Sequence, residues 1–328
     1  MKILVTGGAG FIGSNVVDAY INAGHEVLIA DNLSSGKPEN INPKAKFYRI
    51  DIRSEEIRRL IASSMPDVIN HHAAQISVPA SVGDPIFDAG VNIIGLLYIL
   101  EAARNAGVKK VIFVSSGGTI YGDADKLPTP ETYPARPVSP YAIGKYTGEN
   151  YLRFYGKQYG LDYTVLRYAN IYGPRQVPYA EAGVAAIFMD RLLSKKPCRL
   201  NRYPEEPRGM VRDYCYIGDV ARANILALTK GTNEILNIGT GIGTYTIDLF
   251  NAIFESLKRN FPELPDELKA PQMMPARPGD MKMGCIDSRK AEKTLGWRPE
   301  VDLKTGIELT VKWRLAVNGK KATKGENR

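Results

Sequence analysis

The first 31 residues of the 328-residue chain constrain its fold most strongly. An apolar run at residues 2–6 leads into a glycine cluster and then a helical pattern; the glycines are Gly7, Gly8, Gly10 and Gly13. Such glycines let backbone amides approach a pyrophosphate, and the helix that follows adds a positive dipole. Asp31 ends the next apolar run, 18 residues after Gly13, where its carboxylate can bind ribose hydroxyls and would repel a 2′-phosphate. Together these features predict a dinucleotide site that prefers NAD to NADP.

Short apolar segments alternate with helical patterns through the first half of the chain. The expected strands cover residues 2–6, 26–31, 46–49, 67–70, 110–115 and 162–167, and the expected helices cover residues 11–23, 54–64, 85–106 and 141–159. This alternation is typical of βαβ units, so we predict an α/β fold with a Rossmann-type doubly wound parallel sheet. After Pro174 the pattern loosens, and residues 262–278 contain five prolines. We therefore expect an NAD-binding domain at residues 1–170 with a returning segment near 213–242, and mainly a smaller C-terminal α/β substrate domain at residues 171–328.

Composition narrows the classes of function. The chain has 43 Lys and Arg against 35 Asp and Glu, and residues 301–328 supply half of the net charge of +8. A solvated basic tail, with Lys320, Lys321, Lys324 and Arg328, is therefore favoured over a nucleic-acid site. Three scattered cysteines are too few for a disulfide framework or a zinc site, which indicates no metal and a cytoplasmic location. No apolar run reaches 18 residues and the start does not resemble a signal peptide, so we expect no membrane span.

Tyr141 and Lys145 form the candidate reactive pair. They lie four residues apart on an expected helix and therefore share one face. A free tyrosine has a pKa of about 10, and a nearby ammonium or the positive nicotinamide of NAD favours the phenolate and lowers that pKa. Such a tyrosine can take a proton from a sugar hydroxyl while hydride leaves the same carbon. A tyrosine and a lysine four residues apart are a weak signal alone, because two side chains on the exposed face of a helix would look the same. The dinucleotide pattern upstream favours a catalytic pair.

Further motifs follow in order over nearly the whole chain. They include DNLSSG at 31–36, HHAAQISV at 71–78, SSGGTIYG at 115–122, YAIGK at 141–145, LRYANIYGP at 166–174, VRDYCYIGDVA at 211–221 and ARPGD at 276–280. On these motifs the chain resembles the extended short-chain dehydrogenases/reductases of the nucleotide-sugar epimerase and dehydratase group. The resemblance implies an enzyme that inverts C4 of a UDP-hexose through a transient 4-keto sugar, with NAD as cofactor.

The resemblance also assigns roles by position. The expected NAD-binding residues are Gly7, Gly10, Phe11, Ile12, Asp31, Asn32, Ser35, Gly36, Asp51, Ile52, Ala73, Ala74, Gln75, Asn92, Tyr141, Lys145 and Tyr168. The expected substrate-binding residues are Ser116, Gly117, Tyr141, Asn170, Arg212, Arg277 and Asp280, and the expected catalytic residues are Tyr141, Lys145 and Ser116. Two arginines suit a diphosphate because charge-assisted, bidentate hydrogen bonds are strong.

Three features of the sequence refine this expectation. The group usually has Ser or Thr where this chain has Gly117, so either Ser116 supplies the bridging hydroxyl or Tyr141 meets the sugar directly. Dehydratases and decarboxylases of the group carry a carboxylate before the Tyr-Gly pair, whereas this chain has Gly118, Thr119 and Ile120 there, which argues against elimination. The position that restricts bulky N-acetyl sugars is Gly284, which predicts that UDP-GlcNAc and UDP-GalNAc are accepted as well.

Alternatives stay open at this point. Another nucleotide-sugar enzyme of the group, such as a UDP-glucuronate epimerase, a decarboxylase or a dTDP-sugar enzyme, would share the fold. A non-catalytic dinucleotide-binding protein, or one that binds RNA through its basic tail, is a different class, and salt-sensitive retention on heparin would indicate it. Relatives form homodimers through two helices, which correspond here to residues 91–106 and 142–159.

Overall fold

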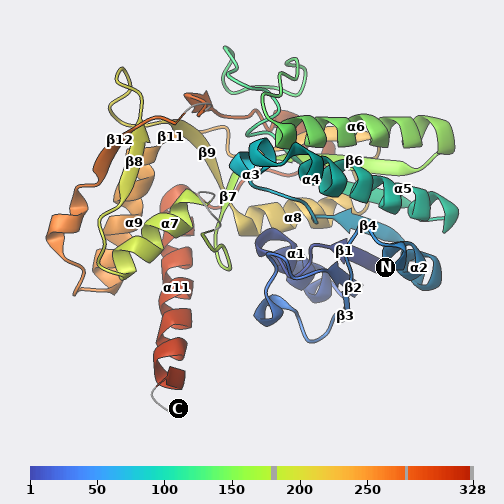
Figure 1. Cartoon of the computed structure of the whole chain (residues 1–328), viewed down its shortest axis with the longest axis horizontal. Helices are drawn as coiled ribbons and strands as arrows, with labels where there is room; N and C mark the ends of the chain where they lie inside the picture. The colour runs from blue at the N-terminus through green and yellow to red at the C-terminus, as the bar shows by residue number, and fades with distance from the viewer. Residues whose placement is uncertain (179–182, 278–279, 326–328) are drawn as a thin grey trace.

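Seven strands form one parallel sheet in the computed structural model, which describes residues 1–178, 183–277 and 280–325 (Figure 1). Their order is β10–β6–β5–β4–β1–β2–β3, and every neighbouring pair is parallel. The strands are β1 (Lys2–Thr6), β2 (Glu26–Asp31), β3 (Lys46–Arg49), β4 (Val68–His71), β5 (Lys110–Ser116), β6 (Asp162–Tyr168) and β10 (Glu234–Ile238). This order is that of a doubly wound sheet, so the predicted fold class is confirmed.

Helices cover both faces of this sheet. Side chains alternate across β1: Ile3 and Val5 join one apolar cluster with helices α1 (Phe11–Asn22) and α8 (Ile217–Ala227), whereas Leu4 joins another cluster. The helices on that second face are α2 (Glu55–Ser64), α5 (Gly95–Asn105) and α6 (Pro140–Tyr159). Because both faces are buried, the strands are continuous apolar runs, which explains why the sequence revealed them.

The expected helix at residues 85–106 has a more complex structure. It is a continuous run of α4 (Pro85–Ala89), a π-helical turn η2 (Gly90–Ile94) and α5. A short helix before it, α3 (Val78–Gly83), was not expected from the sequence. It begins at Ser77, whose Oγ accepts a hydrogen bond from the backbone of Ala80 at 3.2 Å. These short segments surround the reactive pair described below.

The second half of the chain adds two smaller sheets. Strand β9 (Val211–Tyr216) pairs with β7 (Asn170–Tyr172), β11 (Gly243–Tyr245) and β13 (Met283–Gly284), and β8 (Arg199–Arg202) pairs with β12 (Gln272–Pro275). Helices α7 (Val184–Leu193), α9 (Thr246–Asn260) and α11 (Leu303–Gly325) lie beside these sheets (Figure 1). The remaining short segments of the second half are η3 (Asp266–Lys269) and α10 (Arg289–Leu295), and the first half also contains η1 (Pro38–Asn40). The division of the chain into two domains at residue 170 stays a prediction. The solvated basic tail also stays a prediction, because the side chains of residues 319–328 lie outside the described part of the chain.

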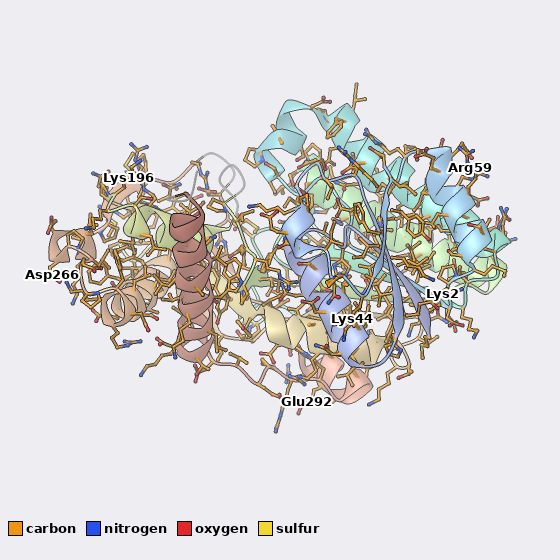
Figure 2. The ribbon with its side chains drawn as sticks, turned by 90° about the horizontal axis from the view of Figure 1, so that it is seen from below. Lys2, Lys44, Arg59, Lys196, Asp266 and Glu292 are labelled. Atoms are coloured by element: carbon orange, nitrogen blue, oxygen red, sulfur yellow. The ribbon has the colours of Figure 1, made fainter. Side chains whose placement is uncertain are left out.

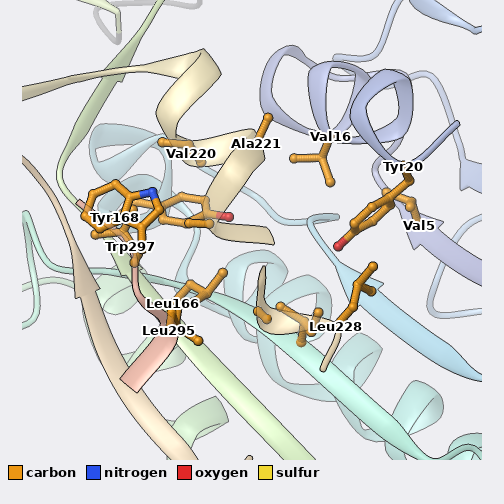
Figure 3. Close-up of a cluster of buried hydrophobic side chains, with 14 of the residues drawn as sticks. Val5, Val16, Tyr20, Leu166, Tyr168, Val220, Ala221, Leu228, Leu295 and Trp297 are labelled. Carbon is orange, nitrogen blue, oxygen red and sulfur yellow. The ribbon is translucent and has the colours of Figure 1, made fainter. Parts of the chain in front are cut away.

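A buried cluster joins the large sheet to the C-terminal segment. Tyr168 lies beside Trp297 in this cluster, with Leu166, Val220 and Leu295 nearby (Figure 3). The Tyr168 hydroxyl accepts a hydrogen bond from Asn224 Nδ2 at 2.7 Å, so its polar end is satisfied inside the core. Charged side chains such as Lys196, Arg59 and Glu292 lie at the periphery of the molecule (Figure 2).

Among the described residues, one helix is long and apolar enough to cross a membrane by length and composition alone. It runs from Pro85 to Asn105, and an 18-residue stretch of it has a mean hydropathy of 1.6 and is 44% buried inside the protein. The helix packs against α2 and α6, and Asp88 and Asn92 on it are buried and hydrogen-bonded. We therefore interpret it as part of the covering layer of the sheet.

Candidate active site

The glycine turn lies where the winding direction of the sheet reverses, between β1 and β4. Gly7 has a φ of +70°, a backbone conformation that favours glycine, and a Cβ added there would lie 2.6 Å from the backbone nitrogen of Ala73. Gly10 precedes the first turn of α1, in which Phe11 and Ile12 lie. The carboxyl ends of β1 and β4 thus meet at the helix N-terminus, which is where doubly wound sheets bind dinucleotides.

The Asp31 carboxylate is held in place by backbone amides. Oδ2 accepts from Ala9 at 3.0 Å and Oδ1 accepts from Leu33 at 2.8 Å. Each oxygen keeps a lone pair for a ribose hydroxyl. Gly36 lies against both oxygens, because a Cβ added there would come within 2.8 Å of Oδ1. The turn at Gly7 and this fixed carboxylate therefore fit a dinucleotide.

The other residues expected near the adenosine differ in how they are placed. Asn32 and Ser35 are exposed after β2, and Asn32 donates to Asp51 Oδ2 at 3.2 Å. Asp51 also pairs with Arg53 at 2.8 Å, and the Arg53 hydrogen bond lowers the pKa of Asp51 to about 2. Ile52 is buried and its side chain packs against Gly95 of α5. Its side chain thus belongs to the core, and only its backbone remains for a ligand.

Tyr141 and Lys145 lie one turn apart near the start of α6, beside the end of β5. Lys145 Nζ donates to the Val114 carbonyl at 3.0 Å and lies 6.0 Å from the centre of the Tyr141 ring. Ser116 lies close enough to Tyr141 to lower the pKa of its phenol. The backbone nitrogen of Tyr141 donates to Ser81 Oγ at 3.2 Å, which fixes the start of the helix against α3.

Desolvation controls the protonation of this pair, in which Lys145 is buried and Tyr141 is partly buried. Desolvation raises the pKa of Tyr141 to about 12; the Ser116 side chain lowers that pKa, and the charge of Asp88 raises it. Burial also lowers the pKa of Lys145 to about 8, while Asp88 raises it. The sequence predicts that Lys145 lowers the pKa of Tyr141, whereas in the structure desolvation of the phenolate is the largest effect and raises that pKa. The protein's own groups leave the phenol protonated at neutral pH.

Gly117 has a packing reason. A Cβ at this position would lie 2.8 Å from Ile286 Cδ1 and 3.3 Å from the Arg167 carbonyl, so Ile286 fills the space that a side chain would need. Of the hydroxyls on this segment, that of Ser116 is the one that lowers the pKa of Tyr141.

A cavity of 930 Å³ adjoins this segment. It is lined by Asn170, Arg212, Arg277 and Asp280, all four of which the sequence singled out. A Cβ at Gly118 would lie 3.7 Å from Asn170 Nδ2, so Asn170 connects the cavity with the turn that follows Ser116. The structure therefore brings Asn170, Arg212, Arg277 and Asp280 together in one cavity, and Asn170 is the member of that lining next to the turn after Ser116.

Two arginines of the cavity are oriented by backbone carbonyls and a carboxylate. Arg212 donates to the carbonyls of Val211 at 2.8 Å and Met281 at 2.7 Å, and burial lowers the pKa of its guanidinium. Arg277 Nε lies 3.3 Å from Asp280 Oδ2. Cationic groups held in this way, in a partly buried cavity, suit a phosphate or diphosphate.

Three expected cofactor residues are engaged by other protein groups. Tyr168 turns its side chain into the core (Figure 3), and only its carbonyl, which accepts from Gly117 at 2.9 Å, faces the site. Gln75 follows Ala73 and Ala74 after β4 and exchanges two backbone hydrogen bonds of 3.0 Å with the Asn92 side chain. Gln75 and Asn92 therefore shape the loop at residues 73–77.

The comparisons decide the family. Residues 3–239 match the NAD dependent epimerase/dehydratase family. The chain belongs to this family. A UDP-glucose 4-epimerase from Thermotoga maritima, solved with UDP-glucose, is 50% identical over 97% of this chain and 99% of that one, with a TM-score of 0.89. A UDP-glucose 4-epimerase from Thermus thermophilus, solved with NAD, is 44% identical over 95% and 98% of the two chains, with a TM-score of 0.88. A UDP-N-acetylglucosamine 4-epimerase from Methanobrevibacter ruminantium, in complex with UDP-N-acetylmuramic acid, is 34% identical over 96% and 98%, with a TM-score of 0.87.

This member of the epimerase/dehydratase family has site residues that the sequence reasoning missed. The cavity is also lined by Arg191, Arg199 and Asn201, which lie in loosely patterned segments that gave no signal. Asp88 is 1% exposed beside the reactive pair, and its only signal was a carboxylate inside an apolar helix. In the described part of the chain no three His, Cys, Asp or Glu side chains lie together as a metal site would require.

Proposed function

We propose that this protein interconverts UDP-glucose and UDP-galactose by inverting C4 through a transient 4-keto sugar, with NAD as a retained cofactor. The observation that carries the proposal is the position of the Ser116–Tyr141 pair. Its segment adjoins the arginine-lined cavity through Gly118 and Asn170. Its helix carries Lys145, whose charge acts on His71 at the end of β4, the strand that ends beside the Gly7 turn. The named relatives solved with UDP-glucose and with NAD support the choice of substrate and cofactor.

In this proposal the two ends of the site hold the two nucleotides. Asp31 accepts hydrogen bonds from the adenosine ribose, and the amides of the Gly7–Gly10 turn bind the pyrophosphate. Arg212 and Arg277 bind the UDP diphosphate, and Asn170 lies between the diphosphate and the sugar. NAD, when bound, supplies the hydride acceptor and a positive ring that favours the Tyr141 phenolate.

Tyr141 then removes the proton from the C4 hydroxyl, and Ser116 orients that hydroxyl toward it. Lys145, fixed by the Val114 carbonyl, keeps a positive charge beside the phenolate. The segment Gly118–Ile120 offers no carboxylate, so no side chain there can assist elimination of water. Inversion needs none, because hydride leaves and returns to the same carbon.

The test is turnover of purified protein with UDP-galactose and no added NAD, with UDP-glucose followed by chromatography. We expect conversion to an equilibrium mixture, which requires both the reaction and a cofactor that stays bound. If no conversion occurs even with NAD supplied, the proposal is wrong, and UDP-glucuronate becomes the next substrate to assay.

We further propose that UDP-GlcNAc and UDP-GalNAc are substrates, because the position that restricts N-acetyl sugars in the family is Gly284 here, which leaves open space beside Arg212. A Cβ built on Gly284 meets its nearest neighbour, Arg212 Cδ, only at 4.0 Å. The family relative that acts on UDP-N-acetylglucosamine supports this extension. We expect Gly284→Tyr to lower kcat/KM for UDP-GalNAc by about 10-fold or more relative to UDP-galactose, because a bulky residue fills the space for the N-acetyl group.

The matched control is Gly284→Ala, which adds one methyl where space exists and should leave both sugar pairs active. Assays of both pairs with the wild-type protein come first. If the wild-type protein turns over UDP-galactose but not UDP-GalNAc, the restriction lies at another side chain and the extension is wrong.

Oligomeric state and location belong to the same proposal. Ile94 on η2 and Ile143 and Phe154 on α6 are about half exposed, which suits burial against a second copy of the chain. We therefore propose a homodimer through η2–α5 and α6, and a monomer by light scattering at micromolar concentration would contradict it.

All three cysteines are free and buried, which supports a cytoplasmic location, and cell fractionation tests that location.

A further inference from the structure

Asp88 is a buried carboxylate that the proposed mechanism does not use. It lies at the end of α4, is 1% exposed, and approaches α6 closely: a Cβ on Gly144 would lie 3.5 Å from Asp88 Oδ2. Gly144 immediately precedes Lys145, so the absence of a side chain at this position lets the carboxylate approach the reactive pair. A buried charge is costly unless it is hydrogen-bonded and paired, so its position calls for an explanation.

The hydrogen bonds of Asp88 connect it to the loop at residues 73–77. Its Oδ1 accepts from Gln75 Nε2 at 2.8 Å and from Asn92 Nδ2 at 3.0 Å. Asn92 lies in the π-helical turn η2 and holds the backbone of Gln75 through two further bonds of 3.0 Å. This loop begins at Ala73, which lies against the Gly7 turn. Asp88 therefore joins α4, η2 and α6 to the loop that adjoins the cofactor cradle.

The charge of Asp88 acts on both members of the pair. Through space it favours the ammonium of Lys145 and disfavours the phenolate of Tyr141. The other titratable groups near Lys145 are neutral or paired. Burial holds the pKa of His71 and His72, at the end of β4, below its usual value, and the Glu149 carboxylate, one turn further along α6, is bound to Arg167 at 2.6 Å. Burial raises the pKa of Asp88 itself, whereas Gln75, Asn92 and Lys145 lower it. Asp88 is thus the anion that faces Lys145 within the described part of the site.

We propose that Asp88 is a positioning residue for the epimerisation. Its carboxylate fixes the loop at residues 73–77 against α6 and supplies the negative charge that keeps Lys145 an ammonium beside Tyr141. The proposal rests on the assignment of Tyr141 and Lys145 as the reactive pair. It has a specific consequence: loss of this one charge changes the pH dependence of the reaction, whereas loss of packing alone does not.

The test is the pH profile of kcat/KM for UDP-galactose in Asp88→Asn. Asparagine keeps an oxygen that can accept from Gln75 and Asn92, so the loop stays in place and NAD stays bound. Removing an anion lowers the pKa of every nearby group, so we expect both limbs of the profile to move to lower pH by about half a unit or more, whichever group each limb reports. Equal loss of rate at every pH, with both limbs unmoved, would overturn the proposal.

Two further variants sharpen the result. Asp88→Ala removes the charge and the hydrogen bonds together. It should move both limbs to lower pH, as Asp88→Asn does, and also release NAD more readily. It replaces Asp88→Asn in the test if that variant fails to fold. Asp219→Asn is the matched control, because Asp219 is 2% exposed but accepts from the backbone of Glu300 and Val301 at 3.1 Å. It should lower stability without moving either limb.

The outcomes separate this proposal from the one on which it rests. If Tyr141→Phe keeps full activity, the assignment of the reactive pair fails and the role of Asp88 fails with it. If Tyr141→Phe is inactive while the limbs of Asp88→Asn match those of the wild-type protein, the pair stands and only the role of Asp88 is wrong.

Discussion

Tyr141→Phe is expected to lower kcat for UDP-galactose by about 10²–10⁴-fold while NAD stays bound. The substitution removes the hydroxyl of Tyr141 on which Ser116 acts and leaves the ring in place. The glycine turn and Asp31, which hold the cofactor in our proposal, are untouched. The measurement is kcat by chromatography of the sugar nucleotides, together with the nucleotide released when the purified variant is denatured.

Tyr146→Phe is the matched control on the same helix. Tyr146 is partly exposed and follows Lys145, and no hydrogen bond of its side chain is seen in the described structure. It should keep the activity of the wild-type protein. A Tyr141→Phe enzyme as active as this control would falsify the proposed role of Tyr141 as the base.

The pH at which the wild-type protein works gives a second view of the same residue. Burial raises the pKa of Tyr141 to about 12, so the protein's own groups alone place the phenolate far above neutral pH. Activity at neutral pH therefore requires a lower pKa in the complex with NAD and sugar. The positive nicotinamide ring is the group that supplies this change in our proposal.

Local chemistry explains why the glycine turn and Asp31 could be predicted from the sequence. Gly7 has a positive φ and touches the backbone of Ala73, and both features require glycine at this position. The glycine in the sequence therefore reveals the turn. Asp31 is identified by its distance from the turn and by its place at the end of a buried strand. The same holds for the strands, because a sheet covered on both faces gives continuous apolar runs.

Contacts between distant segments could not be predicted in this way. Tyr168 has the sequence position of a cofactor residue, but side chains alternate along β6 and that of Tyr168 faces Asn224 and Trp297 in the core. Gly117 departs from the pattern of the family because Ile286, 169 residues later in the chain, fills its space. The pKa of Tyr141 depends on how deeply the assembled fold buries it, and a sequence gives only its neighbours on the helix.

Glu149→Gln is the second change from which we expect a large effect, an unfolding free energy lower by about 3–5 kcal/mol. The Glu149 side chain is 0% exposed and that of Arg167 is 4% exposed, and two Arg167 nitrogens bind the carboxylate at 2.8 and 2.6 Å. Burial lowers the pKa of Arg167, but the hydrogen bonds and charge of Glu149 outweigh burial and raise it. Without Glu149 the guanidinium stays charged, buried and unpaired, which is the costly state.

Thermal and urea unfolding, followed by circular dichroism, measure this change. The control is Glu26→Gln, which breaks the exposed pair of Glu26 with Lys46 and should leave the transition unchanged. The double variant Glu149→Gln/Arg167→Met removes the unpaired charge as well, so it should be more stable than Glu149→Gln alone. If the double variant is instead less stable than either single one, the loss arises from packing and not from an unpaired charge.

The same pair links stability to the reaction. Glu149 lies one turn after Lys145 on α6, it accepts from Ser115 Oγ at 2.7 Å, and Arg167 donates to Tyr121 Oη at 2.8 Å. The pair therefore joins α6, which carries Tyr141, to the end of β5, which carries Ser116. Because a general base works only within hydrogen-bond reach of its proton, a small shift between these two elements weakens proton transfer before it weakens nucleotide binding. We therefore expect the folded fraction of Glu149→Gln to lose kcat while its KM for UDP-galactose stays close to that of the wild-type protein.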